Sequence, residues 1–411
     1  MSFKPSQQIG VGCADISANE KRYVNEALDS NRLSHGKFLT KFETDFAAAH
    51  QTKYAMFCNS GTSALQVALH ALKDKYGWSD DDEVLVPAVT FIATSNVVIQ
   101  NRLKPVFVDI EPDYYEIDPT KIEAKITKRT RAIMPVHLFG QPCEMEPILA
   151  IAKKHNLKIV EDSCETMFVS YQGQPTGSWG DISCFSTYVA HLLVTGVGGF
   201  ACTSDEDLAV RIKSLMNHGR DGIYLHIDDD KNKDNQQLFD LVARRFRFIN
   251  VGYSYRGTEL EGALGVGQME IWPEVLAKRQ ANAAKLIAGL QKHETAGRLQ
   301  LPKIRPETEH AFMMFPIVLK QDKSTSRYRD QLVNYLEEHK IETRPMLPLL
   351  NQPVYIELFG NLEPDYPVAQ WVNNNGFYIG CHQALTEDEI DYIIQTFDQY
   401  FEEQNHEPTK I

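Results

Sequence analysis

Hydrophobic and polar residues alternate along the first two thirds of the chain in blocks that predict strands and helices in turn. Between the strand-like runs lie segments with helical spacing, of which residues 16–30 and 64–69 are examples. Repeated strand–helix units predict an α/β domain whose mostly parallel sheet is covered on both faces and binds its ligand at the carboxyl ends of the strands. The short apolar runs with the character of buried strands are residues 54–58, 83–88, 105–110, 132–137 and 157–160.

The alternation of strand-like and helix-like runs gives way to a different pattern from Pro273 onward, which begins with a long helix. A chain of 411 residues is long enough for two domains. We therefore expect a large domain over residues 1–272 and a smaller α+β domain over residues 273–411, with a loose tail from Glu402. The elements expected in the smaller domain are helices at 275–292, 326–339 and 387–401 and a strand-like run at 311–319.

Composition narrows the classes of function. The formal net charge of -13 argues against binding nucleic acid or anionic lipid through bulk electrostatics. No apolar run reaches the length of a membrane span, and residues 1–8 lack the form of a signal peptide, so we expect a cytoplasmic protein without a membrane partner. The seven cysteines are scattered without a Cys-x-x-Cys pair, which predicts reduced thiols and no metal site.

Candidate chemistry follows three of the predicted strands. Residues 54–58 lead through Gly61, Thr62 and Ser63 into a helix, an arrangement that offers amides and hydroxyls to a phosphate, although the same residues are often a simple helix cap. Asp162 ends another strand, where its carboxylate could hold a protonated ring nitrogen or cap a helix. His191 follows a third strand, and no lysine occurs between Lys158 and Lys213.

The stretch of residues 184–199 resembles the lysine motif of the sugar aminotransferase family of nucleotide-sugar enzymes, Ser-Phe-x-x-x-Lys followed by a Gly-Glu-Gly-Gly-like turn. His191 takes the place of the lysine, Ser186 is retained, and Val197 replaces the usual acidic residue of the turn. The resemblance covers nearly the whole chain and is strongest to the branch of 4-keto-6-deoxyhexose 3-dehydratases. It implies the aspartate aminotransferase-like fold type I and pyridoxal or pyridoxamine 5′-phosphate, bound without a covalent link.

The resemblance also implies roles for individual residues. Phe91 would lie on the face of the cofactor ring, with a core position as the alternative. Glu165, three positions after Asp162, departs from the family's usual amide or imidazole and resembles the acidic residue of the dehydratase branch. Ser254 replaces the asparagine of a Gly-Tyr-Asn-Tyr-Arg signature that reaches the cofactor phosphate of a neighbouring subunit, so a homodimer is implied. The substrate-binding residues implied are His218, Arg220, Arg256 and Arg344.

The segment of residues 222–248 remains open to two interpretations. Its acidic run at 228–234 indicates a solvated loop, whereas the basic and aromatic residues at 244–248 suit either a surface strand or a clamp for a nucleotide diphosphate.

The implied reaction is a 3-dehydration in deoxysugar biosynthesis. The amine of pyridoxamine phosphate would condense with the 4-keto group of a nucleotide-linked 4-keto-6-deoxy sugar, His191 would remove a proton from the C4′ carbon of the cofactor, and the 3-hydroxyl would depart. Histidine suits this task because it can take a proton near neutral pH and return one to the leaving oxygen. The family implies L-glutamate as amine donor. A non-catalytic binding homologue and an aminotransferase with its lysine elsewhere are the alternatives.

Overall fold

A computed structural model of the chain describes residues 3–221, 234–244, 246–320 and 326–406. Its large sheet has seven strands in the order β1-β9-β8-β5-β4-β2-β3, and β9 alone runs antiparallel to its neighbours. The prediction of an α/β fold with a mostly parallel sheet is confirmed. The strands are β1 Tyr54–Cys58, β2 Glu83–Pro87, β3 Lys104–Val108, β4 Thr130–Ile133, β5 Lys158–Asp162, β8 Ile182–Ser186 and β9 Gly199–Thr203.

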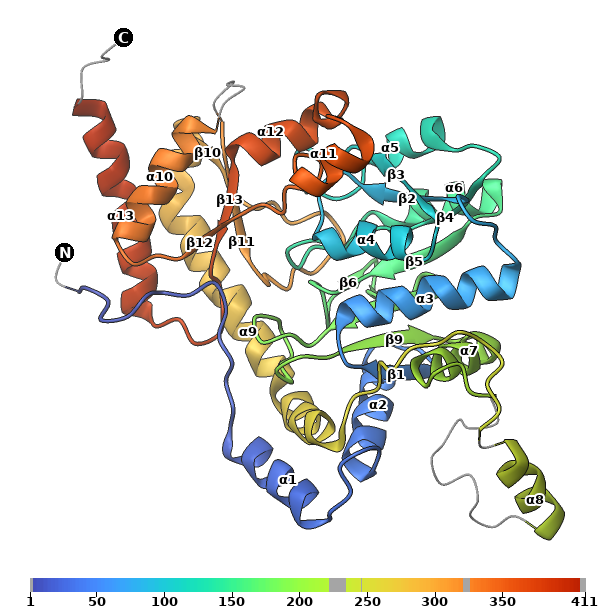
Figure 1. The fold of residues 1–411 in the computed structure, drawn as a ribbon. Helices are drawn as coiled ribbons and strands as arrows, with labels where there is room; N and C mark the ends of the chain where they lie inside the picture. The colour runs from blue at the N-terminus through green and yellow to red at the C-terminus, as the bar shows by residue number, and fades with distance from the viewer. Residues whose placement is uncertain (1–2, 222–233, 245, 321–325, 407–411) are drawn as a thin grey trace.

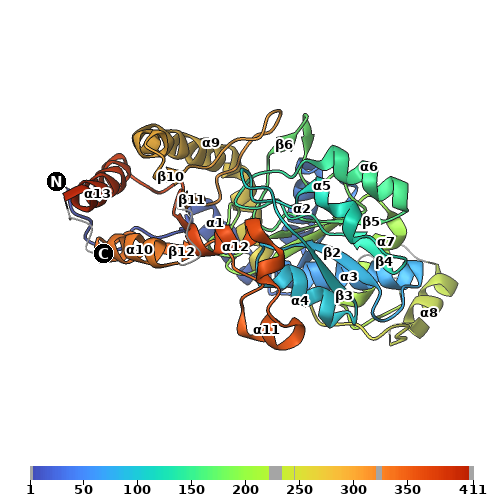
Figure 2. The same cartoon turned by 90° about the horizontal axis from the view of Figure 1, so that it is seen from above.

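Helices cover both faces of the large sheet, which explains why its strands are apolar along their whole length. Figure 2 shows α3 and α4 on one side and α5 and α6 on the other. In β2, Val84 and Val86 pack into the same core as Val97 of α4, whereas Leu85 packs with Ile148 of α6. The helices around this sheet are α3 Gly61–Tyr76, α4 Ile92–Gln100, α5 Pro119–Ile122, α6 Met145–His155 and α7 Glu206–Met216.

The helix α9, Glu259–Thr295, connects the large sheet with the rest of the molecule (Figure 1). Thr258 caps it through a capping box with Glu261, and Pro273 lies inside it. Our prediction that the helix begins after Pro273 is therefore wrong, because the cap and two turns of small residues precede the proline. The helices α1, Ala18–Asp29, and α2, Lys37–Ala49, pack along the first half of α9.

A second, antiparallel sheet has its own core, which includes Phe315, Leu332, Phe377 and Phe397. The predicted boundary between residues 272 and 273 falls inside α9, and the division into domains stays a prediction. The expected loose tail is wrong as far as His406, where α13 ends. The elements here are β10 Leu299–Gln300, β11 Phe315–Leu319, β12 Thr343–Pro345, β13 Gly376–Ile379, α10 Arg327–Glu338, α11 Pro353–Phe359, α12 Pro367–Asn375 and α13 Glu387–His406, with the hairpin β6 Ser170–Tyr171 and β7 Gln174–Pro175 beside the large sheet.

The chain between α7 and α9 is described only in part. Residues 228–233 of the predicted acidic loop, and Arg245, lie outside the described residues. The helix α8, Asn235–Arg244, stands apart from both sheets in Figure 1. Its Phe239 is 68% exposed, and Val251 beyond it is 85% exposed. This part of the chain therefore keeps apolar side chains uncovered.

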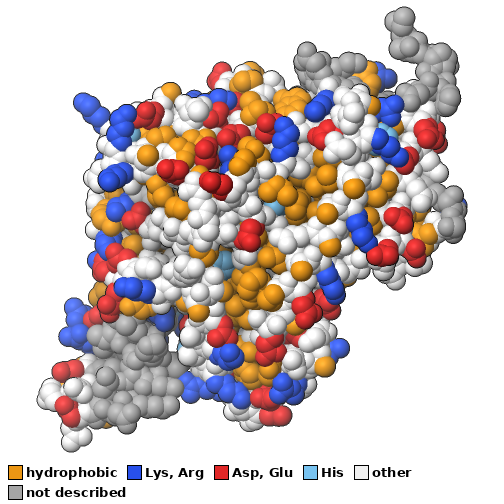
Figure 3. Space-filling view, turned by 180° about the vertical axis from the view of Figure 1, so that it is seen from behind, with side chains coloured by type: hydrophobic (Ala, Val, Ile, Leu, Met, Phe, Trp, Pro, Cys, Tyr) orange, Lys and Arg blue, Asp and Glu red, His pale blue; other side chains and the backbone are white. Residues whose placement is uncertain are grey.

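Three further expectations concern charge, membranes and thiols. The face in Figure 3 mixes acidic and basic side chains, so the net charge does not gather there into one field. No helix among the described residues is long and apolar enough to cross a membrane. All seven cysteines are free, and five of them are buried. Within the described ranges, no group of three or more metal-ligating side chains could hold a metal ion.

Candidate active site

A cavity of about 460 Å³ opens at the carboxyl ends of β1, β2, β5 and β8, where an α/β sheet binds its ligand. Its lining also includes residues from the N-terminal segment and from the second sheet. The predicted site residues that line it are Gly61, Thr62, Phe91, Asp162, Glu165, Ser186, His191 and Arg344.

The amino end of α3 forms one wall of this cavity. The Ser60 side chain accepts a hydrogen bond from the amide of Ser63 at 3.0 Å, whereas the first amides of a helix, here those of Gly61 and Thr62, have no partner within it. A Cβ atom at Gly61 would lie 2.8 Å from Cβ of Ser186, so glycine lets α3 approach the end of β8. The helix end, with its partial positive charge and free amides, is suited to a phosphate.

Asp162 lies at the bottom of the cavity and is 3% exposed. Its Oδ2 accepts from Thr94 Oγ1 at 2.8 Å and its Oδ1 from the amide of Cys164 at 3.1 Å. In the described part of the chain, no Lys or Arg forms an ion pair with it, and burial raises the pKa of this carboxyl against the effect of its hydrogen bonds. A buried carboxylate held in this way is ready to accept a cationic ring N–H.

Glu165 is a second buried carboxyl group in the same cavity. Its Oε2 accepts from the amide of Phe139 at 3.0 Å, and its side chain is 7% exposed. Burial raises the pKa of Glu165 to about 7. This residue can therefore hold or release a proton near neutral pH, whereas a solvated glutamate stays ionised there.

Phe91 caps α4 and presents its ring to the cavity, with 56% of the residue exposed. The alternative that Phe91 belongs to the core is wrong, because core aromatic residues of this sheet such as Phe57 are fully buried. An exposed ring over a cavity is suited to stack on a flat ligand.

His191 lies on the connection between β8 and β9, which folds back on itself. Thr187 and Thr195 join across this loop through their hydroxyls at 2.6 Å, and the Val189 amide donates to the Gly196 carbonyl at 3.1 Å. Nδ1 of His191 lies 3.1 Å from the carbonyl oxygen of Ser186. Because a carbonyl only accepts, Nδ1 carries the proton of the neutral ring and Nε2 keeps a free lone pair.

The surroundings of His191 favour its uncharged form. Burial and, to a smaller extent, the nearby Arg279 cation lower the pKa of His191 to about 4, against the effect of its bond to Ser186. At neutral pH the imidazole is therefore neutral and able to accept a proton at Nε2.

Side chains from distant parts of the sequence complete the cavity. Arg344 of β12 is half exposed, donates to the carbonyl of Thr343 at 2.8 Å and pairs with Glu342. Val11, Met314 and Tyr378 also line the cavity. Sequence reasoning missed these three because nothing in their local pattern distinguishes them from core residues.

The other five predicted residues lie outside the cavity lining. Ser63 is buried in the first turn of α3, where its hydroxyl lies 2.9 Å from that of Ser60. Ser254, Arg256 and His218 form an exposed cluster. Arg256 donates to Asn217 Oδ1 at 2.8 Å and to Ser254 Oγ at 3.1 Å, and its Nη2 lies 3.4 Å from Nε2 of His218. We call these four side chains the Arg256 cluster. Arg220 lies beside Phe246 and Phe248, with its guanidinium 5.4 and 5.9 Å from their ring centres.

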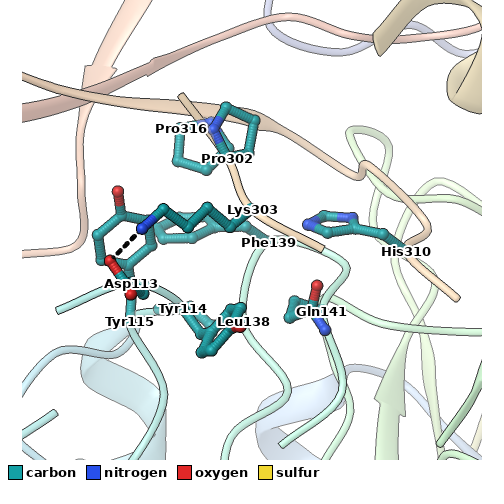
Figure 4. Close-up of a pocket in the computed structure, with 10 residues that line it drawn as sticks. All are labelled: Asp113, Tyr114, Tyr115, Leu138, Phe139, Gln141, Pro302, Lys303, His310 and Pro316. Atoms are coloured by element: carbon teal, nitrogen blue, oxygen red, sulfur yellow. Dashed lines mark hydrogen bonds and ion pairs between the residues drawn. The ribbon is translucent and has the colours of Figure 1, made fainter. Parts of the chain in front are cut away.

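A second, much smaller cavity of about 10 Å³ lies where the large sheet meets the segment that leads to β11 (Figure 4). His310 and Gln141 line it, and Lys303 reaches across to Asp113 at 2.6 Å. Its volume admits about one water molecule, so it cannot hold a cofactor.

Comparison with known proteins identifies the family. Residues 14–398 match the model of the DegT/DnrJ/EryC1/StrS aminotransferase family. The chain belongs to this family. The prediction of a sugar aminotransferase family member is thereby confirmed.

Relatives within the family have different activities. GDP-perosamine synthase of Caulobacter vibrioides is 36% identical over 397 residues, which are 95% of this chain and 98% of that protein. The structure of Escherichia coli GDP-4-keto-6-deoxy-D-mannose-3-dehydratase with bound hydrated PLP superposes with a TM-score of 0.84, at 26% identity, over 95% of this chain and 99% of that one. The structure of a GDP-4-keto-6-deoxymannose-3-dehydratase with a trapped PLP-glutamate geminal diamine superposes with a TM-score of 0.83, also at 26% identity, over 96% of this chain and 100% of that one.

Proposed function

We propose that this protein is a pyridoxamine phosphate-dependent 3-dehydratase of a nucleotide-linked 4-keto-6-deoxy sugar. One observation carries the proposal: His191, with an uncharged imidazole, lies in the cavity at the strand ends, and the described residues that line this cavity include no lysine. Without a lysine the cofactor is held by non-covalent contacts alone. The similarity to a solved 3-dehydratase supports the same reaction.

The cavity fits pyridoxal or pyridoxamine phosphate at three points. The free amides of Gly61 and Thr62, with the hydroxyls of Ser63 and Ser186, suit the phosphate. The Asp162 carboxylate, which has no cationic side-chain partner, suits the protonated pyridine nitrogen, and the exposed ring of Phe91 suits the face of the ring. The bound cofactor would supply an amine for the sugar ketone and a ring that accepts electrons.

The remaining chemistry belongs to side chains of this chain. We assign to Nε2 of His191 the removal of the proton at the cofactor's C4′ carbon that precedes loss of the 3-hydroxyl, because the Nδ1 proton is held by Ser186. His191 then carries the proton that the leaving oxygen needs. Glu165, with a pKa of about 7, holds a proton in the same cavity.

The substrates follow from the cavity and the relatives. Arg344 presents a half-exposed guanidinium to the cavity, which suits the carboxylate of L-glutamate or a sugar diphosphate. The dehydratase with a trapped PLP-glutamate supports glutamate as amine donor. GDP in the names of the relatives supports a guanosine nucleotide sugar.

The proposed active form is a homodimer. The Arg256 cluster, with the half-buried Arg220 beside it, bears the exposed cation of Arg256 but lies outside the cavity of its own chain. We propose that Ser254, Arg256, His218 and Arg220 serve the cavity of a second copy, where they meet cofactor phosphate or substrate. The exposed apolar residues Phe239 and Val251 in the neighbouring segment support an interface there.

A nucleotide-sugar 4-aminotransferase is the second candidate, favoured by the 36% identity to GDP-perosamine synthase. Product analysis separates the two. The purified protein should be incubated with glutamate and GDP-, CDP-, dTDP- and UDP-linked 4-keto-6-deoxyhexoses, and the products identified by mass spectrometry. We expect a 3-deoxy sugar; a 4-amino sugar from the unmodified protein would reject the dehydratase, and no product from any nucleotide would favour a non-catalytic homologue.

The role of His191 is tested on the same products. His191→Asn should bind the cofactor, as judged by absorbance, but lose deoxygenation by at least about 1000-fold, on the scale of removing an acid–base residue. His155→Asn, which alters a histidine paired with Glu123 on the surface, is the matched control. Borohydride treatment and peptide mass spectrometry should find no cofactor-modified lysine in the parent protein, and a modified lysine there would contradict non-covalent binding.

A further inference from the structure

Arg279 of α9 is a fully buried cation whose partners are all backbone carbonyls. Its Nη1 donates to the carbonyls of Met313 at 2.9 Å and Phe312 at 3.3 Å, and its Nη2 to that of His191 at 3.5 Å. Within the described residues it forms no ion pair with a carboxylate, and its Nε has no partner. A buried charge without a counter-charge costs stability, so a merely structural role would be better served by a neutral side chain.

The three carbonyls belong to opposite walls of the cavity. His191 lies on the loop between β8 and β9, whereas Phe312 and Met313 precede Met314, which lines the cavity on the side of the second sheet. The segment of Phe312 is itself tied to the large sheet, because the amide of Ala311 donates to the carbonyl of Gly140 at 2.7 Å. Arg279 therefore sets the position of the His191 backbone against a fixed opposite wall.

Other contacts hold the same loop without adding charge. Gln268, also on α9, accepts at its Oε1 from the amide of Val194 at 3.3 Å. The N-terminal segment touches the loop beside His191, since a Cβ atom at Gly12 would lie 2.9 Å from Cα of Ala190. The loop thus has ties that can be removed separately from the Arg279 cation.

We propose that Arg279 is a positioning residue that fixes the backbone of His191 and, through its unpaired charge, adds to the effect of burial in keeping the His191 imidazole uncharged and able to act as a base. This role rests on the proposed function of His191. A positive charge on the imidazole would be repelled by the guanidinium that bonds to the carbonyl of the same residue, and burial of Arg279 strengthens this repulsion.

Among the described residues, no other cation around His191 lowers the pKa of its imidazole. The Arg279 cation adds to burial in lowering the pKa of His191, and burial lowers the pKa of Arg279 itself to about 10. The buried thiol of Cys381 has its pKa raised to about 12 and stays neutral. The titratable or charged groups that face His191 or Arg279 are Tyr188 on the loop, Cys13 and Asp15 on the N-terminal segment, Cys381 and His382 after β13, Asp162 and Glu165 across the cavity, and Arg344 of β12.

Titration of His191 in the cofactor-free protein tests the proposal. Nuclear magnetic resonance of histidine-labelled protein, with the His191→Asn spectrum to assign the signal, gives the titration midpoint directly. In Arg279→Gln, which removes the charge and whose amide ends near the position of the Arg279 Nε, we expect the midpoint to rise but to stay below the ordinary value for histidine, because burial, the larger cause, remains. Arg279→Lys keeps the charge and should leave the midpoint low. Gln268→Leu, which removes the Val194 contact together with the bonds to Asp15 and Glu20 but leaves the Arg279 charge in place, should do the same.

The pH at which the deoxygenation rate falls on the acidic side of its pH–rate profile, the acidic limb, should move in the same direction as the titration midpoint of His191. Arg279→Gln should shift this limb to higher pH, whereas Arg279→Lys should lower the rate without shifting it. If the protein shows no dehydratase activity, the proposed function fails while the titration still decides the role of Arg279. An unchanged midpoint in Arg279→Gln, an equal shift in the glutamine and lysine variants, or failure of both to fold would overturn the proposal.

Discussion

His191 and Arg256 lie on two connections of the chain, of which the first lines the cavity and the second lies on the surface outside it. The His191 loop has bonds across itself, two contacts from α9 and a contact from the N-terminal segment. The Arg256 side chain donates to Asn217 and Ser254 on the surface, and its backbone pairs with Cys58 at the end of β1. The cavity gathers eight of the predicted site residues within one chain, whereas the Arg256 cluster lies outside it and, in the proposed homodimer, would act in the cavity of a second copy.

Burial shows the same contrast. Asp162 is 3% exposed, and burial raises its pKa, so the protein maintains a buried carboxyl group that lacks a cation. Such an arrangement is unfavourable unless a ligand supplies the positive charge. The guanidinium of Arg256 remains in water, where a charge without a partner carries little cost.

Removal of the buried charge should have the largest effect. Asp162→Asn should fold but lose at least about 100-fold in turnover, because an essential electrostatic partner of the cofactor ring is removed. Steady-state rates of deoxygenation measure this, with Asp118→Asn, which alters only the cap of α5, as the control. A variant as active as the parent would show that the ring nitrogen does not lie at this strand end.

Removal of the exposed charge should have a smaller effect that depends on association. Arg256→Ala should weaken the dimer and lower kcat/KM by about 10-fold, which corresponds to the loss of one interface cation. Analytical ultracentrifugation and kinetics over a range of protein concentrations measure the two effects. Arg211→Ala, whose partner Asp207 lies one helical turn away on the surface, should change neither. Full activity of a monomeric parent protein would contradict the proposed role of the cluster.

The last effect concerns stability and pH. The pKa of Glu165 is raised from 4.5 to about 7, so its ionisation opposes folding: the folded state is favoured below pH 4.5 and loses stability as pH rises to about 7. Glu165→Gln keeps an acceptor for the Phe139 amide and should remove this loss, about 1–3 kcal/mol at pH 7. Urea unfolding of the cofactor-free protein at pH 5 and pH 7 measures it. If the free energy of unfolding changes equally in the parent and in Glu165→Gln between pH 5 and pH 7, the raised pKa of Glu165 is contradicted.

The sequence by itself determined the order of strands and helices and the residues at the strand ends. Gly61, Asp162, Ser186 and His191 follow apolar runs, and the sheet brings the ends of those runs to one edge. Local periodicity is sufficient for this, because residues two or four apart already define which face of an element is buried. The start of α9 was mislocated because the proline inside it is a strong local signal for a helix boundary.

Only the tertiary structure decided which distant residues meet at the cavity. Arg344, Val11 and Tyr378 reach it from the second sheet and the N-terminal segment, whereas Arg256 and His218 lie outside it on the surface. Arg279 is an unremarkable arginine in a helical sequence, and its unpaired burial beneath His191 becomes visible only when α9 packs against the loop. These contacts join residues far apart in the chain, and their formation depends on how whole elements pack, which no local pattern encodes.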